Sequence, residues 1–260
     1  MGGALRVILV SHASSFTVLV AIALLRGDTF PHGAALAWGI GAGVAGGISL
    51  TCFYIALSRG AMGASAALSG LLAAAIPALV SALVEGTPGA HRIAGFVVAG
   101  VAIWMIAAGP NAEAVPAKAG TVWLAAAAGV GFGIYFVGLR MAGVAGVIWP
   151  MATARIGSLS VCSLMLAVLL LRRGGAEPAE GRLTRTAVRW AWTTALLDTS
   201  GNLLFIAATR AGRLDVAAVL ASLYPATTIL LAAWMLSERP TRRQGLGMLV
   251  AAAAVVMITL

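Results

Sequence analysis

The chain has 260 residues, of which 61% are hydrophobic and only 10% are charged, against about 25% charged residues in an average soluble domain. A soluble globular fold is therefore excluded, because so few polar side chains could not cover its surface. The formal net charge of +9 does not indicate nucleic-acid binding, because nearly all the basic residues lie at the ends of apolar runs, where they orient membrane helices.

Nine apolar runs follow one another along the chain, each about long enough to cross the hydrocarbon core as a helix. They cover residues 4–25, 35–57, 63–84, 92–108, 121–139, 147–171, 190–209, 214–236 and 244–260. The first run lacks a small-x-small cleavage site, so we interpret it as a span and not as a secretion signal. The sequence predicts an all-α, multi-pass integral membrane protein of the cell (plasma) membrane, with the lipid bilayer as its partner.

Glycines recur inside the second run. The stretch GAGVAG, residues 41–46, matches the G-x-G-x-x-G pattern, but a dinucleotide site requires a preceding strand and a βαβ unit, which an apolar span cannot supply. Gly39, Gly43 and Gly47 are spaced by four residues, which lets helix backbones approach closely in a bilayer. These glycines predict helix packing, and no cofactor is expected.

Two segments of the chain repeat. FYIALSRGAMGASAAL from Phe53 aligns with LFIAATRAGRLDVAAV from Leu204 at an offset of 151, and Glu85 and Glu238 each end a span. At an offset of 143, His12 aligns with Arg155. Because a repeat of five spans reverses direction across the membrane, two such repeats are inverted relative to each other, with a site expected at their interface.

The sequence resembles the EamA-type transporters of the drug/metabolite transporter superfamily. The resemblance rests on ALSRG in the first half and on AATRAGRLDVAAVLASLYPATTILLAAWMLSERPTRRQGLG in the second. It implies two repeats of five helices, although Glu85 is followed by Gly86 where the family has Arg. We expect a first repeat over 1–110, a linker over 111–120 and a second repeat over 121–260.

The first repeat shows four of its five helices. The element without a partner is the counterpart of 121–139, so the first helix of the first repeat is missing. We expect a translation start upstream of Met1, because a missing helix would leave one wall of the pathway open to lipid; a design with nine helices is the alternative.

A carboxylic acid, Asp198, lies near the middle of the run 190–209. A charge at that depth costs about 2.5–3.5 kcal/mol on insertion scales, and such residues usually face a bundle interior or a water-filled cavity. Thr194, Asp198 and Asn202 are spaced by four residues and form one polar stripe on a helix. The stripe is a candidate substrate- or proton-binding site; the alternative is a protonated Asp198 that hydrogen-bonds across helices.

Arg155 is the expected partner of Asp198, with a weaker case for His12. A pathway-facing Arg155 could hold an anionic group of a substrate, but its side chain could also snorkel to the interface. His12 could titrate near neutral pH or simply pack. Four aromatic residues could line a cavity: Tyr54, Tyr135, Trp149 and Tyr224. Trp149 could instead anchor its helix at the membrane interface. Glu85 and Glu238 are expected to cap the loops that follow them.

Two classes of function remain open. The first is a secondary transporter that exports small metabolites or amphipathic compounds by alternating access, with Asp198 binding the small-molecule substrate or a proton. The second is an intramembrane enzyme that acts on a lipid-embedded substrate. The spans contain no H-E-x-x-H, G-x-S-x-G or paired-Asp arrangement, and the chain has no Walker A sequence. We therefore expect a transporter and not an enzyme, with no metal.

Basic residues predict the orientation. The side that holds the start of the first span and the 172–189 loop carries 11 of them, and the opposite side carries 5. The positive-inside rule places that loop in the cytoplasm and the carboxyl terminus outside. The ten-helix arrangement implied by the resemblance, with both termini cytoplasmic, would place the loop outside; we expect the orientation that follows from the basic residues.

Overall fold

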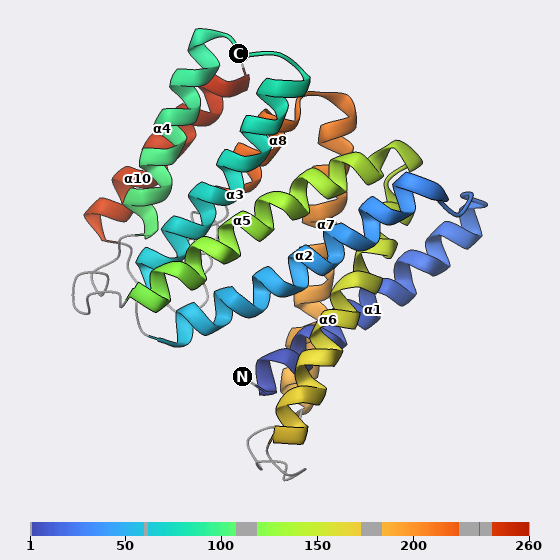
Figure 1. Cartoon of the computed structure of the whole chain (residues 1–260). Coiled ribbons are helices and arrows are strands. Elements are labelled where there is room, and N and C mark those ends of the chain that lie inside the picture. The colour runs from blue at the N-terminus through green and yellow to red at the C-terminus, as the bar shows by residue number, and fades with distance from the viewer. Residues whose placement is uncertain are drawn as a thin grey trace. The chain divides into compact units, whose positions relative to one another are not determined.

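The structure is a computed structural model that describes residues 2–59, 62–107, 119–172, 184–223, 234 and 241–259 (Figure 1). Every regular element within these ranges is a helix. The elements are α1 (Gly2–Arg26), α2 (Gly33–Ser58), α3 (Met62–Val84), α4 (Ala90–Ala107), α5 (Ala119–Ala142), the 3-10 turn η1 (Gly143–Ala145), α6 (Ile148–Arg172), α7 (Arg185–Ala211), α8 (Leu214–Ala221) and α10 (Arg242–Thr259). The all-α prediction is confirmed.

Six of these helices are long and apolar enough to cross a membrane: α1, α2, α3, α5, α6 and α10. Helix α4 is apolar but shorter. Helix α7 has 27 residues, but it is absent from these six because Asp198, Asn202 and its hydroxyl side chains lower its hydropathy. Residues 224–233 of the predicted span 214–236 lie outside the described residues.

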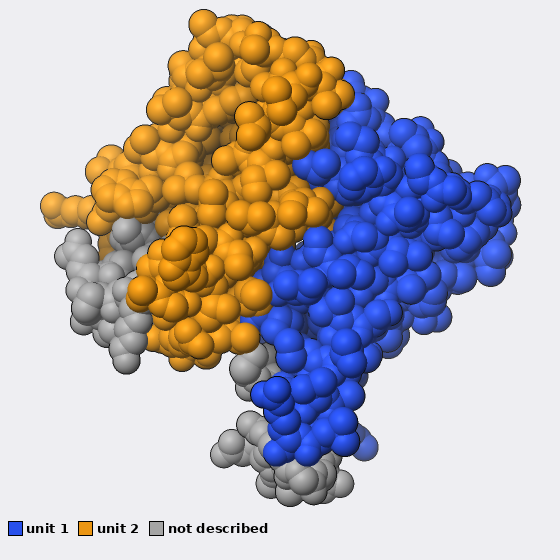
Figure 2. All heavy atoms as spheres, in the orientation of Figure 1, with its two compact units in different colours: residues 1–51, 137–211 blue, residues 52–136, 212–260 orange. Residues whose placement is uncertain are grey.

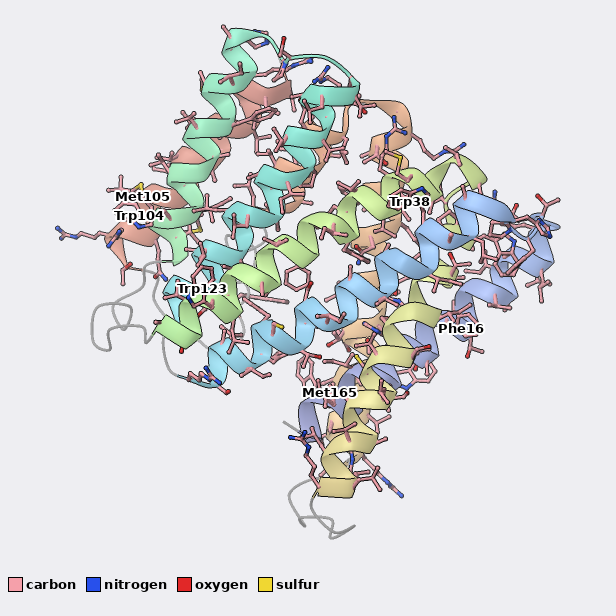
Figure 3. All side chains as sticks on the ribbon, in the orientation of Figure 1. Phe16, Trp38, Trp104, Met105, Trp123 and Met165 are labelled. Atoms are coloured by element: carbon pink, nitrogen blue, oxygen red, sulfur yellow. The ribbon has the colours of Figure 1, made fainter. Side chains whose placement is uncertain are left out.

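Large apolar side chains remain exposed on these helices. Trp38, Trp104 and Trp123, all labelled in Figure 3, are 45%, 55% and 74% exposed. Soluble monomers rarely leave so much apolar surface uncovered, whereas lipid covers it in a membrane. The Arg243 guanidinium lies over the Trp104 ring, 4.2 Å from the ring centroid, which is a cation–π interaction.

The chain forms two compact units, and each combines helices from both halves of the sequence (Figure 2). Unit 1 comprises residues 1–51 and 137–211, and unit 2 comprises residues 52–136 and 212–260. In unit 1, α1 packs against α6 and α7; in unit 2, α3 packs against α8, and α4 packs against α10. The pairs α1 with α6, α3 with α8 and α4 with α10 join helices that occupy equivalent places in the proposed repeats.

Glycines bring α2 and α6 into backbone contact in unit 1. A Cβ atom at Gly43 would overlap the backbone carbonyl of Ala154, and a Cβ atom at Gly157 would overlap the carbonyl oxygen of Ile40. The packing role predicted for the α2 glycines is therefore confirmed. Arg155 lies on α6 between these two contact positions, Ala154 and Gly157.

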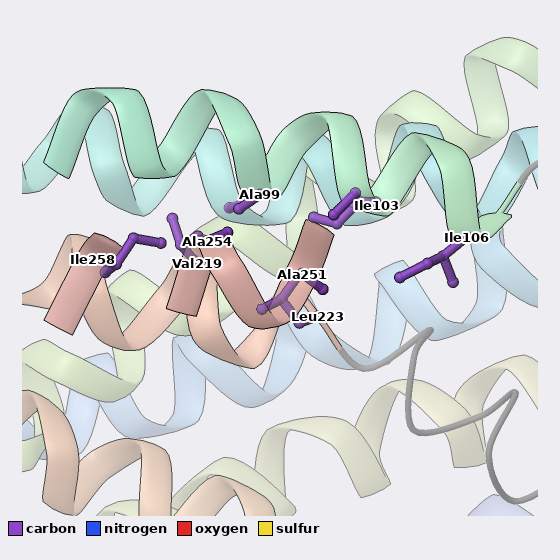
Figure 4. Close-up of a cluster of buried hydrophobic side chains, with 10 residues drawn as sticks. Ala99, Ile103, Ile106, Val219, Leu223, Ala251, Ala254 and Ile258 are labelled. Carbon is purple, nitrogen blue, oxygen red and sulfur yellow. The ribbon is translucent and has the colours of Figure 1, made fainter. Parts of the chain in front are cut away.

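Unit 2 contains an apolar core between α4 and α10. Ala99, Ile103 and Ile106 of α4 face Ala254 and Ile258 of α10 (Figure 4). Val219 and Leu223 join the same cluster from α8 and the turn after it. Small alanine side chains let the two helices approach, and the isoleucine side chains fill the space that remains.

Candidate functional site

An ion pair joins α6 to α7 inside unit 1. The Arg155 guanidinium donates through Nη2 to the Asp198 carboxylate. The expected pairing of these two residues is therefore confirmed. The side chains differ in exposure: that of Arg155 is 4% exposed and that of Asp198 is 40% exposed. The cation is thus buried in protein, and its counter-ion is accessible.

The burial of Arg155 excludes the snorkelling alternative, in which its guanidinium would reach the membrane interface. The same Nη2 also donates to the Thr199 hydroxyl, at 3.2 Å. Its Nε atom is buried and finds no hydrogen-bond acceptor among the described residues. A buried donor without an acceptor is unfavourable by about 1–3 kcal/mol, so the guanidinium can accept a further anionic or carbonyl partner.

Asn202 holds the carboxylate from the other side. Its Nδ2 donates to the Asp198 backbone oxygen at 2.9 Å and to Asp198 Oδ1 at 3.1 Å. One carboxylate oxygen thus faces Asn202 and the other faces Arg155. Thr194, the third member of the predicted stripe, is exposed and takes no part in these bonds. The hydroxyl that reaches Arg155 belongs to Thr199, which is not part of the predicted stripe.

The His12 ring contacts Ser158 of α6, and the described residues show no hydrogen bond or ion pair between His12 and Asp198. Its side chain is buried, and its Nδ1 lies 2.9 Å from the Ser158 hydroxyl. Ser158 also donates to the Arg155 backbone oxygen at 3.2 Å, and Ser15 donates in the same way to the His12 backbone oxygen at 3.1 Å. The positions that align at an offset of 143 therefore make equivalent hydrogen bonds on α6 and α1.

Of the four aromatic residues expected around a cavity, Trp149 belongs to the unit that holds the ion pair. Trp149 is buried; its indole N–H donates to the Asp28 backbone oxygen at 2.9 Å, and its ring packs edge-on against Phe30, 4.9 Å between centroids. Trp149 therefore holds the α1–α2 loop and is not an exposed interface anchor. Tyr54 and Tyr135 belong to unit 2, whereas Tyr224 and Glu238 lie outside the described residues.

Sequence reasoning missed Thr199 and Ser158 as members of the site, although both carried a signal. Thr199 directly follows Asp198, and Ser158 is one turn beyond Arg155 on the same helix. A hydroxyl at either place can satisfy a buried cation or imidazole. The assembled group offers a buried cation at Arg155 and an accessible carboxylate at Asp198, with the hydroxyls of Thr199 and Ser158 beside them.

The carboxyl-terminal half of the chain, residues 119–260, matches the model of the EamA-like transporter family. No curated protein sequence matches the chain significantly. A solved structure described as "Crystal structure of protein" superposes with a TM-score of 0.76 at 17% sequence identity, covering 98% of this chain and 86% of that one. At this identity the likeness shows the fold alone.

Proposed function

Because this chain belongs to the EamA-like transporter family, and is thus a multi-pass membrane transporter of the drug/metabolite transporter superfamily, we propose that it exports small metabolites or amphipathic compounds by alternating access. The Arg155–Asp198 pair is the proposed binding site. The proposal rests on one observation, a buried arginine whose only carboxylate partner in the described residues is 40% exposed. A charge pair whose only role is stability could often be replaced by apolar side chains of similar volume at no cost in stability.

The exposed carboxylate is the part of the site that can be exchanged. Protonation of Asp198 would weaken its bond to Arg155, and an anionic group of a substrate could replace it. The substrate would then use Nη2 and the unsatisfied Nε together, which is a bidentate arrangement favoured between guanidinium and carboxylate groups. Thr199 would retain the guanidinium during the exchange.

The net charge of the site indicates which class of solute it would prefer. The ion pair has no net charge, and an unpaired charge in a low-dielectric interior is strongly unfavourable. A solute that carries one anionic and one cationic group can enter between Arg155 and Asp198 without leaving either charge alone. A solute with a single negative charge needs a proton on Asp198 as well, so its transport would be coupled to pH.

The ion pair also distinguishes the two proposed repeats. Arg155 aligns with His12, and Asp198 aligns with Gly47 at the offset of 151. The first repeat therefore holds no charge at either place. In the inverted-repeat transporters, sites form where the repeats meet, and the contact of His12 with Ser158 joins equivalent helices beside the proposed site.

The decisive experiment is flux into liposomes that contain the purified protein. A zwitterionic, an anionic and a cationic solute are each followed with and without a pH gradient, and recovered solute is checked for chemical change. Asp198→Asn should lower flux about 100-fold, which corresponds to about 2.7 kcal/mol in the free-energy barrier to transport, while membrane expression stays near normal.

The matched control is Asp28→Asn, which removes an equivalent carboxylate from the exposed Arg26–Asp28 pair, whose atoms are 3.4 Å apart. Flux through this variant should equal that of the unmodified protein. Full, pH-responsive transport by Asp198→Asn would refute the assignment of the site, and chemical conversion of the solute would point to an enzyme.

A further inference from the structure

A second charged cluster lies in unit 2, whereas the residues of the proposed binding site belong to unit 1. It joins the carboxyl end of α3 to the amino end of α8. Arg213 precedes α8 and forms a bidentate pair with Asp215: Nε lies 3.1 Å from Oδ1, and Nη2 lies 2.9 Å from Oδ2. The Asp215 side chain is fully buried.

The same guanidinium caps helix α3. Arg213 Nη1 donates to the Glu85 backbone oxygen at 3.2 Å, and Nη2 donates to the Gly86 backbone oxygen at 2.7 Å. Gly86 has φ of +86°, the left-handed conformation that commonly ends a helix. A cation here satisfies terminal carbonyls and opposes the negative end of the helix dipole.

Glu85 returns the same kind of bond to α8. Its Oε2 accepts from the Leu214 backbone N–H at 3.2 Å and from the Ser81 hydroxyl at 2.7 Å. Leu214 is the first residue of α8, where backbone N–H groups lack helical partners and a negative charge is favourable. Each helix therefore supplies the charge that caps the other. Glu85 was expected to cap the loop that follows it, and the structure shows that it caps α8 instead.

The first half of the sequence has no charge at the places that correspond to Arg213 and Asp215, although Glu238 corresponds to Glu85. At the offset of 151, Met62 takes the place of Arg213, and Ala64 takes the place of Asp215. If the repeats are inverted, these positions fall at the opposite membrane side. Hydrogen bonding to Asp215 raises the pKa of the Arg213 guanidinium above its usual value, so Arg213 stays a cation at any pH that a cell meets.

We infer that the Arg213–Asp215–Glu85 cluster is a one-sided latch that holds the transporter closed at the side of the α3–α4 and α7–α8 loops and makes it rest open toward the other side. The inference rests on the proposed function, because only an alternating-access protein has two such states. Separation of the helix ends on this side must break these bonds. At the corresponding place on the other side, Met62 and Ala64 cannot form an arginine–carboxylate pair.

The sidedness agrees with export. Arg213 belongs to the membrane side that carries 5 basic residues, which is the outer side in the orientation that we expect. A latch at the outer side leaves the resting protein open to the cytoplasm, where an exporter collects its substrate. The α7–α8 loop is short, so release of the latch also frees the end of the helix that carries Asp198.

The test measures access to α7 from each membrane side. Cys52 and Cys162 are replaced by alanine, and Gly201→Cys supplies a reporter thiol three residues from Asp198, where an added Cβ atom meets no neighbour within 4 Å. An impermeant maleimide is applied to intact cells and to inverted vesicles. In the latched protein, labelling should be faster from the side opposite the latch.

The latch variant is Arg213→Gln with Asp215→Asn, which removes both charges together and leaves no unpaired buried charge. Labelling from the latch side should rise roughly tenfold, the expected consequence of losing hydrogen bonds to charged groups. The matched control is Arg26→Gln with Asp28→Asn, which neutralises another Arg-x-Asp pair in an exposed loop and should change nothing.

Unchanged labelling in the latch variant, or equal labelling from both sides before any latch substitution, would overturn the inference. Should the double variant fail to fold, Arg213→Lys keeps the charge but not the bidentate geometry, and an unchanged labelling ratio there has the same meaning. Liposome flux tests the proposed function separately. Normal flux with unchanged labelling in the latch variant would overturn the latch alone, whereas absence of flux for every solute would refute the proposed function and the latch with it.

Discussion

Two helix contacts, one in each unit, bury different kinds of side chain. Between α4 and α10 in unit 2, the buried cluster consists of alanine, isoleucine, valine and leucine. Between α1, α6 and α7 in unit 1, the buried side chains include His12, Arg155, Ser158 and Thr199. Both arrangements pack helices, so helix packing alone does not require a charge. Residues of this kind inside a membrane span are the usual starting point for a functional hypothesis, and the proposed binding site consists of them.

The contrast extends to how closely the helices approach. In unit 1, Gly157 meets the backbone of α2, which cannot move aside. In unit 2, Gly247 of α10 meets mainly the Ile106 and Met105 side chains, with Ile106 Cγ1 2.8 Å from an added Cβ atom. A rigid backbone contact fixes the position of Arg155, whereas side chains in the apolar core can adjust.

The largest expected effect follows from this difference. Gly157→Ala should lower the free energy of unfolding by about 3 kcal/mol and displace Arg155, whereas Gly247→Ala should lower it by about 1 kcal/mol. Unfolding in mixed detergent micelles measures both changes, and liposome flux should fall only for Gly157→Ala. Equal losses of stability in the two variants would show that the backbone contact in unit 1 is not special.

A smaller effect is expected from the hydroxyl beside the ion pair. Thr199→Val keeps the shape of the side chain but removes an acceptor of Arg155, so stability should fall by about 1 kcal/mol. Because Thr199 is proposed to hold the guanidinium during exchange, flux should fall roughly tenfold, as when one bond in a binding site is lost.

Thr209→Val is the matched control for that substitution. Thr209 is also a buried threonine of α7, but its hydroxyl donates to the Ile206 backbone oxygen of its own helix at 2.9 Å. This variant should transport normally. Similar flux through both variants would remove Thr199 from the proposed site and leave the carboxylate as the sole exchangeable partner of Arg155.

The smallest effect is expected at Trp149. Trp149→Phe removes the hydrogen bond to the Asp28 backbone oxygen but keeps an aromatic ring against Phe30. Stability should fall by about 1 kcal/mol, and flux per folded molecule should stay unchanged. A large loss of flux with normal thermal stability would instead return Trp149 to the substrate pathway, as the sequence allowed.

Much of the fold could be predicted because the relevant signals are local. Apolar runs of membrane length predicted the helices, and the glycines at 39, 43 and 47 predicted close packing. The sequence also predicted an ion pair between Arg155 and Asp198, because a charged side chain inside an apolar run is energetically costly unless it has a partner. The division into repeats and the orientation stay predictions.

The sequence by itself determined that the protein is helical and lies in a membrane, because hydropathy and helix length are properties of consecutive residues. Only the tertiary structure decided which hydroxyl satisfies Arg155, that Trp149 holds a loop, and that Arg213 and Glu85 cap each other's helices. Each of these contacts joins residues more than forty positions apart. Hydrogen bonds depend on the distance and direction between two groups in space, and the order of the residues does not specify either quantity for groups so far apart in the chain.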